Sequence, residues 1–326
     1  MERLPLGAAG PLVTRIGLGL AAVGRPAYIN LGRGRDLGQN RSREALRARA
    51  HQLLDHAYQL GIRYFDVARS YGLAEEFLAS WLRLRAPLGQ PLTVGSKWGY
   101  IYVGGWRLDA PVHEVKDHSL ETLRRQYAES QRLLGASLLL YQVHSATLES
   151  GVLEDKEVLT ELERMARSGL GIGLTVSGPE QAAVIRRAMA LTAEGRAPFS
   201  CVQATWNLLE QSAGDALSEA HEMGWGVLVK EVVANGRLLE GGGQHADRVR
   251  VLAESIGVPP DQLAVAAALA QPFQATVLSG AVNLAQLSSH VRALDIELSK
   301  AERRSLAELA LPPRQYWSER AGLAWT

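Results

Sequence analysis

The chain has 326 residues, of which 47% are hydrophobic and 21% are charged, proportions typical of a globular protein with a large buried core. Its 35 Lys and Arg nearly balance its 34 Asp and Glu, so no net charge favours a nucleic acid or an anionic membrane surface as a partner. A single cysteine, Cys201, excludes an intramolecular disulfide, and the N-terminus has no signal-peptide pattern, so the cytoplasm is the expected location.

The most apolar long stretch, residues 263–282, contains Gln271, Pro272 and Gln274. These residues interrupt the apolar run and argue against a membrane-spanning segment. We therefore expect a protein that does not cross a membrane.

Short apolar runs rich in Val, Leu and Ile alternate along the chain with longer segments of helical periodicity. This alternation is typical of βα units around a parallel sheet. We predict eight strands, at residues 16–22, 63–67, 92–97, 138–144, 171–176, 202–207, 226–231 and 276–280.

Helical stripes lie between these strands, with apolar residues at every third or fourth position in 45–60, 120–134 and 284–294. Each stripe can cover one face of the sheet. Ahead of the first strand, residues 3–6 and 12–14 flank a Gly-Ala-Ala-Gly turn, which predicts a short β-hairpin that closes the barrel floor. Ser299 and Glu302 form a capping-box pattern, which predicts one extra C-terminal helix to about residue 309.

This order of elements predicts that residues 1–326 form one domain, a (β/α)8 TIM barrel. A doubly wound open sheet is the alternative, but residues 17–22 at the first strand lack the third glycine of its phosphate-binding motif. Two long loops, 24–42 and 98–118, follow the first and third strands. Loops that follow barrel strands form the active-site face.

Four polar residues follow neighbouring strands: Asp66 and Tyr71 after the second, Lys97 after the third and His144 after the fourth. A phenol beside an ammonium group is expected to have a lowered pKa, which suits a general acid or base. Asp66 would orient and partly neutralise Lys97, and His144 would bind the substrate oxygen. Each residue alone has an ordinary structural explanation. Together they favour a functional site, because desolvating them is otherwise costly.

Residues 65–72, Phe-Asp-Val-Ala-Arg-Ser-Tyr-Gly, resemble the signature of the aldo-keto reductase family, an Asp, four residues, then Tyr-Gly. Lys97 and His144 follow the next two strands, where the family has its other catalytic residues, and the resemblance covers nearly the whole chain. It implies an NAD(P)H-dependent oxidoreductase that interconverts an aldehyde or ketone with an alcohol by hydride transfer. Tyr71 would be the general acid and base, tuned by Lys97 and Asp66, while His144 aligns the substrate.

The resemblance also implies cofactor contacts, with NADP(H) favoured and NAD(H) possible. Gln203 and Ser177 match the family residues that face the nicotinamide, and Gly280 lies in a loop that resembles the adenine-phosphate loop, at a helix start where backbone amides suit an anion. Gln286 and His290 lie one turn apart on that helix. They either reach the adenosine or belong to a solvated helix face.

Two positions depart from the family pattern. Gly178 replaces the usual asparagine, and Lys230 replaces the aromatic residue that stacks on the nicotinamide. Lys230 has two explanations: a second charge that faces the cofactor, or a side chain that pairs with Glu231 or another nearby acid. These departures keep open a second function, a cofactor-binding regulatory or sensor protein of the same fold with little turnover.

The long loops are expected to line the substrate pocket with Trp98, Tyr28 and Trp106, which suits an apolar, aromatic or sugar substrate. The expected partner is thus a small carbonyl compound or alcohol, and the oligomeric state is left open. A Schiff-base aldolase that uses Lys97 is a further alternative, but a lysine paired with an aspartate stays protonated. His113 and His118 lack a known zinc-site spacing, so no metal is expected.

Overall fold

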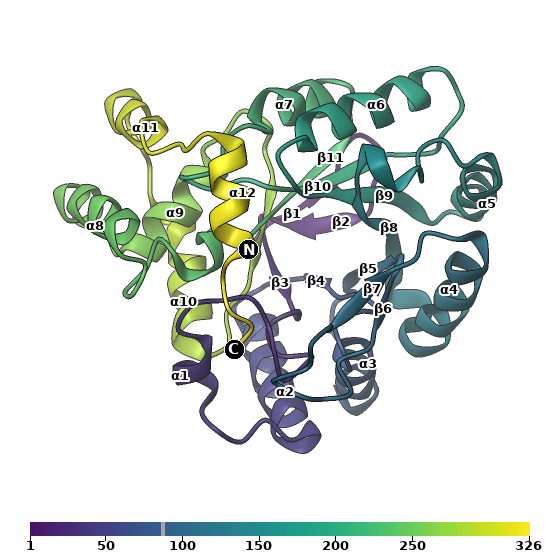
Figure 1. Ribbon diagram of the computed structural model, residues 1–326, viewed down its shortest axis with the longest axis horizontal. Coiled ribbons are helices and arrows are strands. Elements are labelled where there is room, and N and C mark those ends of the chain that lie inside the picture. The colour runs from purple at the N-terminus through teal and green to yellow at the C-terminus, as the bar shows by residue number, and fades with distance from the viewer. Residues whose placement is uncertain (86–88) are drawn as a thin grey trace.

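The computed structural model describes residues 1–85 and 89–326. Eight parallel strands form a closed barrel, in which each strand pairs with its neighbours along the chain and the last pairs with the first (Figure 1). The strands are β3 (Ile16–Gly19), β4 (Tyr64–Asp66), β5 (Thr93–Trp98), β8 (Leu138–Ala146), β9 (Gly171–Val176), β10 (Cys201–Thr205), β11 (Gly226–Lys230) and β12 (Thr276–Ser279). All eight predicted strands are confirmed, with ends that differ by at most a few residues.

Helices surround the barrel, as Figure 1 shows. The helices that follow the barrel strands are α2 (Arg43–Gln59), α3 (Ala74–Arg85), α4 (Leu120–Leu134), α5 (Lys156–Arg167), α6 (Gln181–Ala193), α7 (Gly214–Glu222), α8 (Gln244–Ile256), α9 (Pro260–Leu269) and α10 (Leu284–Arg292). Short turns of 3-10 helix occur at η1 (Gly135–Ser137), η2 (Leu148–Ser150), η3 (Ala234–Gly236) and η4 (Ala293–Asp295). Because the helices cover the outer face and side chains fill the interior, the strands are buried on both faces.

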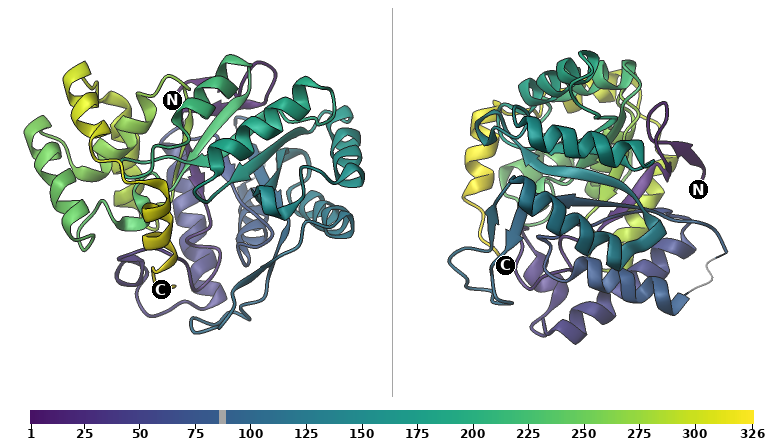
Figure 2. Two further views of the ribbon diagram at one scale, coloured as in Figure 1. Left: turned by 45° about the horizontal axis from the view of Figure 1, so that its top comes forward. Right: turned by 90° about the vertical axis from the view of Figure 1, so that its right-hand side faces the viewer.

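The N-terminal hairpin closes the barrel floor, as the sequence predicts. Its strands β1 (Arg3–Pro5) and β2 (Leu12–Thr14) pair antiparallel, and Gly7 pairs with Trp225, just before β11 begins. Leu6 and Val13 of the hairpin pack against interior residues of the barrel, including the buried Cys201. Figure 2 shows the hairpin and the C-terminal end on opposite sides of the molecule. The hairpin therefore leaves the other end of the barrel free.

That other end carries the long loops. The loop after β3 contains α1 (Arg33–Leu37), and the loop after β5 contains an antiparallel hairpin of β6 (Tyr100–Tyr102) and β7 (Glu114–Lys116). Both loops follow strand carboxyl ends, as the sequence predicts for the active-site face.

Two helices follow α10 rather than the one that the sequence predicts. The first, α11 (Lys300–Ala307), begins with the predicted capping box of Ser299 and Glu302. The second, α12 (Pro313–Ala321), begins with a proline at its first position, where the missing amide hydrogen costs no helical hydrogen bond. Beyond α12 the chain returns to the first long loop, where Trp325 pairs with Ile29. The C-terminal segment thus borders the barrel mouth, as Figure 1 shows.

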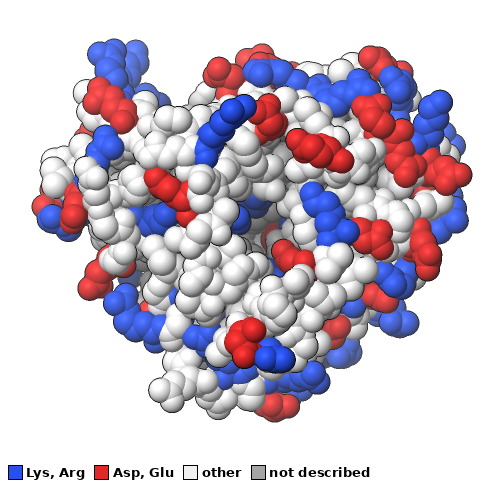
Figure 3. Space-filling model, viewed as in Figure 1, with Lys and Arg blue, Asp and Glu red and all other residues white. Residues whose placement is uncertain are grey.

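Charged side chains of both signs are spread around the face drawn in Figure 3, and the middle of this face is mostly uncharged. Among the residues that the structure describes, no helix combines the length and the hydropathy needed to cross a membrane.

Candidate active site

A cavity lies at the carboxyl ends of the barrel strands and comprises about 650 Å³ of empty space, part of which is open solvent. Five strands contribute to its wall through Gly19, Asp66, Gln203, Lys230 and Ser279. The loops that follow the strands add Ala21, Ala22, Tyr28, Asn30, Tyr71, Glu231, Val232, Val233, Asn235 and Gly280.

An ion pair between Lys97 and Asp66 lies at the base of this cavity. Both side chains are almost fully buried, and the Lys97 ammonium also donates a hydrogen bond to the Val67 carbonyl at 3.0 Å. Burial is the largest influence on the pKa of Lys97 and lowers it, while the attraction of Asp66 opposes that shift. A buried pair of this kind is stable only while both partners are present.

The second oxygen of Asp66 binds Gln203. The Gln203 amide nitrogen donates to Asp66 Oδ2 at 2.9 Å, and the Tyr64 hydroxyl lies 3.4 Å from the same oxygen. The resemblance implied that Gln203 holds the nicotinamide. Gln203 lines the cavity, and its amide nitrogen holds the Asp66 carboxylate.

Tyr71 lies in the wall of the cavity, and the Lys97 ammonium is 4.8 Å from the centre of its ring. The expected lowering of its pKa is wrong. Burial raises the pKa of Tyr71 well above its ordinary value, and the Asp66 charge raises it further, against an opposing effect of Arg25. The ammonium of Lys97, which is paired with Asp66, does not offset these two effects. Tyr71 therefore keeps its proton at neutral pH.

His144 completes the group of four predicted residues. Its ring meets the Tyr71 ring edge to face, with centroids 5.5 Å apart, and its Nδ1 lies 3.4 Å from the Ser70 hydroxyl. Burial lowers the pKa of His144 well below its ordinary value, and the charges of Lys97 and Lys230 lower it further. A neutral imidazole beside a protonated phenol can hydrogen-bond a polar substrate atom without taking its proton.

Lys230 extends into the cavity wall from the end of β11. Its ammonium donates to the Thr205 hydroxyl at 2.9 Å. Glu231, the acid that could have paired with it, forms its ion pair with Arg320 of α12 instead. Burial lowers the pKa of Lys230 to about 8. Of the two explanations considered for Lys230, the structure favours a charge that faces the cavity.

The other proposed cofactor residues are placed differently. Gly280 lines the cavity, and no atom lies within 4 Å of a Cβ built there, so the space beside it is open. Gln286 instead binds the Asp36 carboxylate at 2.8 Å and the backbone amide of Val282 at 2.9 Å. His290 is buried and hydrogen-bonds the Ser279 hydroxyl at 2.7 Å. These bonds occupy both side chains within the protein.

Ser177, the remaining cofactor candidate, is half-buried and does not line the cavity. The glycine after it, Gly178, adopts a φ of +96°, a conformation that suits glycine far better than the asparagine of the family pattern. The backbone conformation at residue 178 therefore explains why this chain has glycine where the family pattern has asparagine.

Two buried carboxamide oxygens in the cavity wall, Asn30 Oδ1 and Asn235 Oδ1, have no hydrogen-bond partner among the described residues. Buried acceptors normally find a donor, and the hydroxyl and amide groups of a nicotinamide nucleotide are suitable donors. With the open space at Gly280 and apolar Val232 and Val233 beside them, the residues of this cavity fit such a cofactor. Asn235 was not predicted. Asn235 precedes Gly236, and an Asn-Gly pair indicates a turn. That pattern could have suggested the positive φ of 57° that Asn235 adopts.

Of the three aromatic residues predicted for the pocket, only Tyr28 lines the cavity. Trp98 is fully buried and packs edge to face against His118. Trp106 packs against Phe77 and donates its indole hydrogen to the Arg41 carbonyl at 3.0 Å. These two tryptophans serve packing, which corrects the prediction that they line the pocket.

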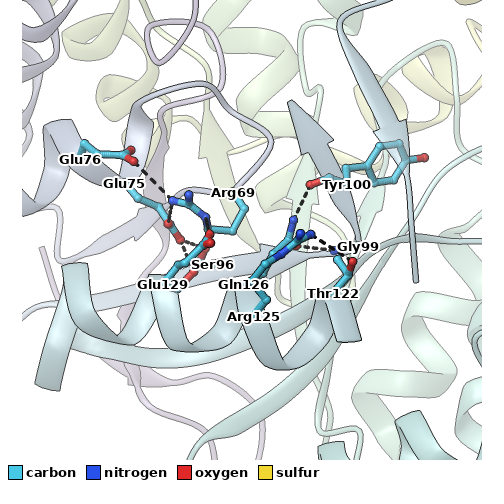
Figure 4. A network of polar contacts seen from close by, with 11 residues as sticks. Arg69, Glu75, Glu76, Ser96, Gly99, Tyr100, Thr122, Arg125, Gln126 and Glu129 are labelled. Carbon is cyan, nitrogen blue, oxygen red and sulfur yellow. Dashed lines mark hydrogen bonds and ion pairs between the residues drawn. The ribbon is translucent and has the colours of Figure 1, made fainter. Parts of the chain in front are cut away.

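A polar network behind the site joins strand β5, the loop after β4 and helices α3 and α4 (Figure 4). The buried Glu75 accepts hydrogen bonds from Ser96 and Ser130, each at 2.6 Å, and pairs with Arg69 at 2.6 Å. Ser96 precedes Lys97, and Arg69 precedes Tyr71 by two residues, so this network holds together the two segments that carry Lys97 and Tyr71. No local sequence pattern predicts this network, because its members come from four separate segments.

Gln126 of α4 holds the loop after β5 in the same way (Figure 4). Its side chain accepts from the amide of Gly99 and donates to the carbonyl of Tyr100, both at 2.9 Å. The Tyr100 ring lies 5.0 Å from the His144 ring. The position of the aromatic ring beside His144 thus depends on α4.

Comparison with known proteins agrees with this geometry. Residues 15–310 match the sequence model of the aldo/keto reductase family. Among solved structures, the chain is similar to an aldo-keto reductase from Bacillus halodurans in its holo form, with a TM-score of 0.72 and 22% sequence identity. The match covers 96% of this chain and 97% of that one, and it shows the fold. Two structures from Pseudomonas aeruginosa, described as those of candidate aldo-keto reductases, each share 25% sequence identity with this chain and cover 90% of it. The first has a TM-score of 0.64 with 96% of its own chain covered, and the second has a TM-score of 0.62 with 95% covered.

Proposed function

Because the chain belongs to the aldo/keto reductase family, whose members carry out nicotinamide-dependent carbonyl oxidoreduction, we propose that Tyr71 is its general acid and base. The observation that carries the proposal is the Tyr71 phenol in the cavity wall, with the ammonium of the Lys97 and Asp66 ion pair 4.8 Å from the centre of its ring. In this proposal the protein reduces an aldehyde or ketone, or oxidises the corresponding alcohol.

Each residue has a separate role. The hydroxyl of Tyr71 donates its proton to the carbonyl oxygen, and in the reverse direction it accepts the proton of the alcohol. The Lys97 ammonium stabilises the phenolate that forms, because it lies 4.8 Å from the ring centre. Asp66 holds that ammonium in place, and Gln203 holds Asp66. The neutral imidazole of His144 orients the carbonyl oxygen by a hydrogen bond.

The proposed cofactor is NADP(H), with NAD(H) as the alternative, and it supplies the hydride when bound. Asn30 and Asn235 would accept hydrogen bonds from the cofactor. The open space at Gly280 would let part of the cofactor lie against the protein backbone there. Lys230 would lie beside it. Binding in this cavity keeps the cofactor next to Tyr71, which lines the same wall.

Of the two alternative functions, the aldolase fits less well and the sensor differs only in turnover. A Schiff-base aldolase would need Lys97 as a nucleophile, but its ammonium is paired with Asp66 and does not line the cavity. A sensor that binds the cofactor with little turnover is compatible with the same cavity. It differs from a reductase only in the absence of carbonyl reduction, so turnover separates the two.

Binding and turnover can be measured on the purified protein. Fluorescence titration with NADPH and NADH tests the cofactor site, and the loss of reduced cofactor with a series of aldehydes and ketones tests the reaction. A reductase binds at least one cofactor and oxidises it with some of these carbonyl compounds. Binding without turnover across the series would indicate the sensor, and failure to bind either cofactor would contradict both.

A further inference from the structure

Lys230 lines the cavity without an ion-pair partner of its own among the described residues. Asp66 is paired with Lys97, Glu231 with Arg320, and Glu114 with Arg25. Within the part of the chain that the structure describes, Lys230 has no carboxylate partner, and its ammonium binds only the Thr205 hydroxyl. Glu231 attracts Lys230 as well as Arg320, so one carboxylate is shared by two cations and the group keeps an excess of one positive charge beside the cavity.

This charge acts on the reaction centre. Lys230 lines the same cavity as Tyr71, and its charge contributes to the lowered pKa of His144. Hydride transfer requires the hydride donor in contact with the carbonyl carbon, whose oxygen Tyr71 protonates. The nicotinamide ring must then lie within the field of Lys230. Such a ring is neutral when reduced and carries one positive charge when oxidised.

We propose that Lys230 makes this protein bind the reduced nicotinamide nucleotide more tightly than the oxidised one, by repelling the positive charge of the oxidised ring. The inference rests on the proposed function, because it needs the cofactor in this cavity. Two like charges about 6 Å apart at an effective dielectric constant of about 20 repel by an amount equivalent to roughly a hundredfold in affinity. Solvent at the open side of the cavity reduces this, and we expect a preference of about tenfold.

The preference has two consequences for turnover. An oxidised nucleotide formed by carbonyl reduction leaves more readily, and the emptied site takes up the reduced form from a mixed pool. Hydride addition neutralises the oxidised ring and relieves its repulsion from Lys230. An oxidised ring held beside Lys230 is therefore a stronger hydride acceptor, by the same free energy that separates the two affinities. Lys230 thus distinguishes the oxidised cofactor from the reduced one. The cavity shape and the contacts to the nucleotide phosphates cannot do so, because both forms of the cofactor share them.

The test compares dissociation constants for the oxidised and reduced forms of the same nucleotide. NADP+ and NADPH are titrated into the wild-type protein and into the variants Lys230→Met and Lys230→Arg, and the ratio of the two constants is taken. The phosphates and riboses are common to both forms, so their contacts cancel in the ratio. Lys300→Met, which removes a charge from the exposed start of α11, is the matched control.

The wild-type ratio should favour NADPH by about tenfold. Lys230→Met should bring the ratio close to one, while Lys230→Arg and Lys300→Met should leave it near the wild-type value. Equal affinities in the wild type would overturn the inference even if Lys230→Met failed to fold. So would an equal loss of affinity for both forms in Lys230→Met, which would show that Lys230 binds a group common to both. If the wild type binds neither nucleotide, the proposed function itself fails.

Discussion

The amide nitrogen of Gln203, at β10, donates a hydrogen bond to the carboxylate of Asp66, at β4, over 2.9 Å. These residues are 137 positions apart in the sequence and meet across the barrel interior. The bond fixes the carboxylate that holds Lys97. We therefore propose that Gln203 is a positioning residue, which acts on Tyr71 through the ion pair.

This role predicts the phenotype of Gln203→Leu. The variant leaves Asp66 without its closest neutral side-chain donor, so kcat for carbonyl reduction should fall by about tenfold or more, since hydrogen bonds to charged groups contribute on the order of 1.5–3 kcal/mol. The dissociation constant for NADPH should change by less than about threefold. Steady-state kinetics and fluorescence titration measure the two quantities. A large rise in the dissociation constant with an unchanged kcat would show instead that Gln203 holds the cofactor.

The ion pair of Lys97 and Asp66 predicts a change in stability. Lys97→Met leaves a buried carboxylate without its cation, so the free energy of unfolding should fall by roughly 3–5 kcal/mol. Adding Asp66→Asn removes the uncompensated charge, and the double variant should be more stable than Lys97→Met alone. Urea denaturation at neutral pH measures all of these proteins. If the second substitution destabilises further, the two groups do not form the buried pair described here.

The ion pair of Glu231 and Arg320 predicts a dependence of stability on acid. Burial tends to raise the pKa of Glu231, but Arg320 and Lys230 outweigh it and lower the value to about 2 from its ordinary 4.5. As the pH falls, the Glu231 carboxylate is therefore protonated in the unfolded chain before it is protonated in the folded protein. Stability from the pair, roughly 2–3 kcal/mol, is complete above about pH 4.5 and is lost as the pH falls toward 2.

Urea denaturation at pH 7 and pH 3 checks this dependence. Between these values the wild type should lose more stability than Glu231→Gln, which has no carboxylate to protonate. Glu163→Gln, in the exposed pair with Arg167, serves as the control and should follow the wild type. An identical loss in Glu231→Gln and wild type would rule out Glu231 as a source of the acid sensitivity.

Local patterns in the sequence predict the barrel well because each strand is a short apolar run and each helix has its own stripe. They do not predict α12, whose segment 313–321 has no such stripe. Its contacts are distant in sequence: Arg320 pairs with Glu231, and the Tyr316 hydroxyl accepts a hydrogen bond from Asn207. A helix stabilised mainly by such contacts cannot be recognised from local periodicity.

The candidate site is predictable to a similar degree. Residue types at strand ends and the family resemblance brought together Asp66, Tyr71, Lys97 and His144. The direction of the pKa shift of Tyr71 could not be read in the same way, because it depends on how deeply the ring is buried and on which charge Asp66 has already neutralised. Likewise, nothing in the sequence shows that Trp98 faces His118 rather than the cavity.

The role of Tyr71 is tested most directly by comparing two tyrosines of the same cavity. Tyr71→Phe and Tyr28→Phe each remove one hydroxyl from the wall, and both variants are assayed for NADPH binding and for reduction of the best carbonyl substrate. Tyr71→Phe should bind NADPH as the wild type does and lose at least a hundredfold in kcat, while Tyr28→Phe stays within roughly tenfold. If Tyr71→Phe keeps its turnover, the proton comes from another group and the proposed mechanism is wrong.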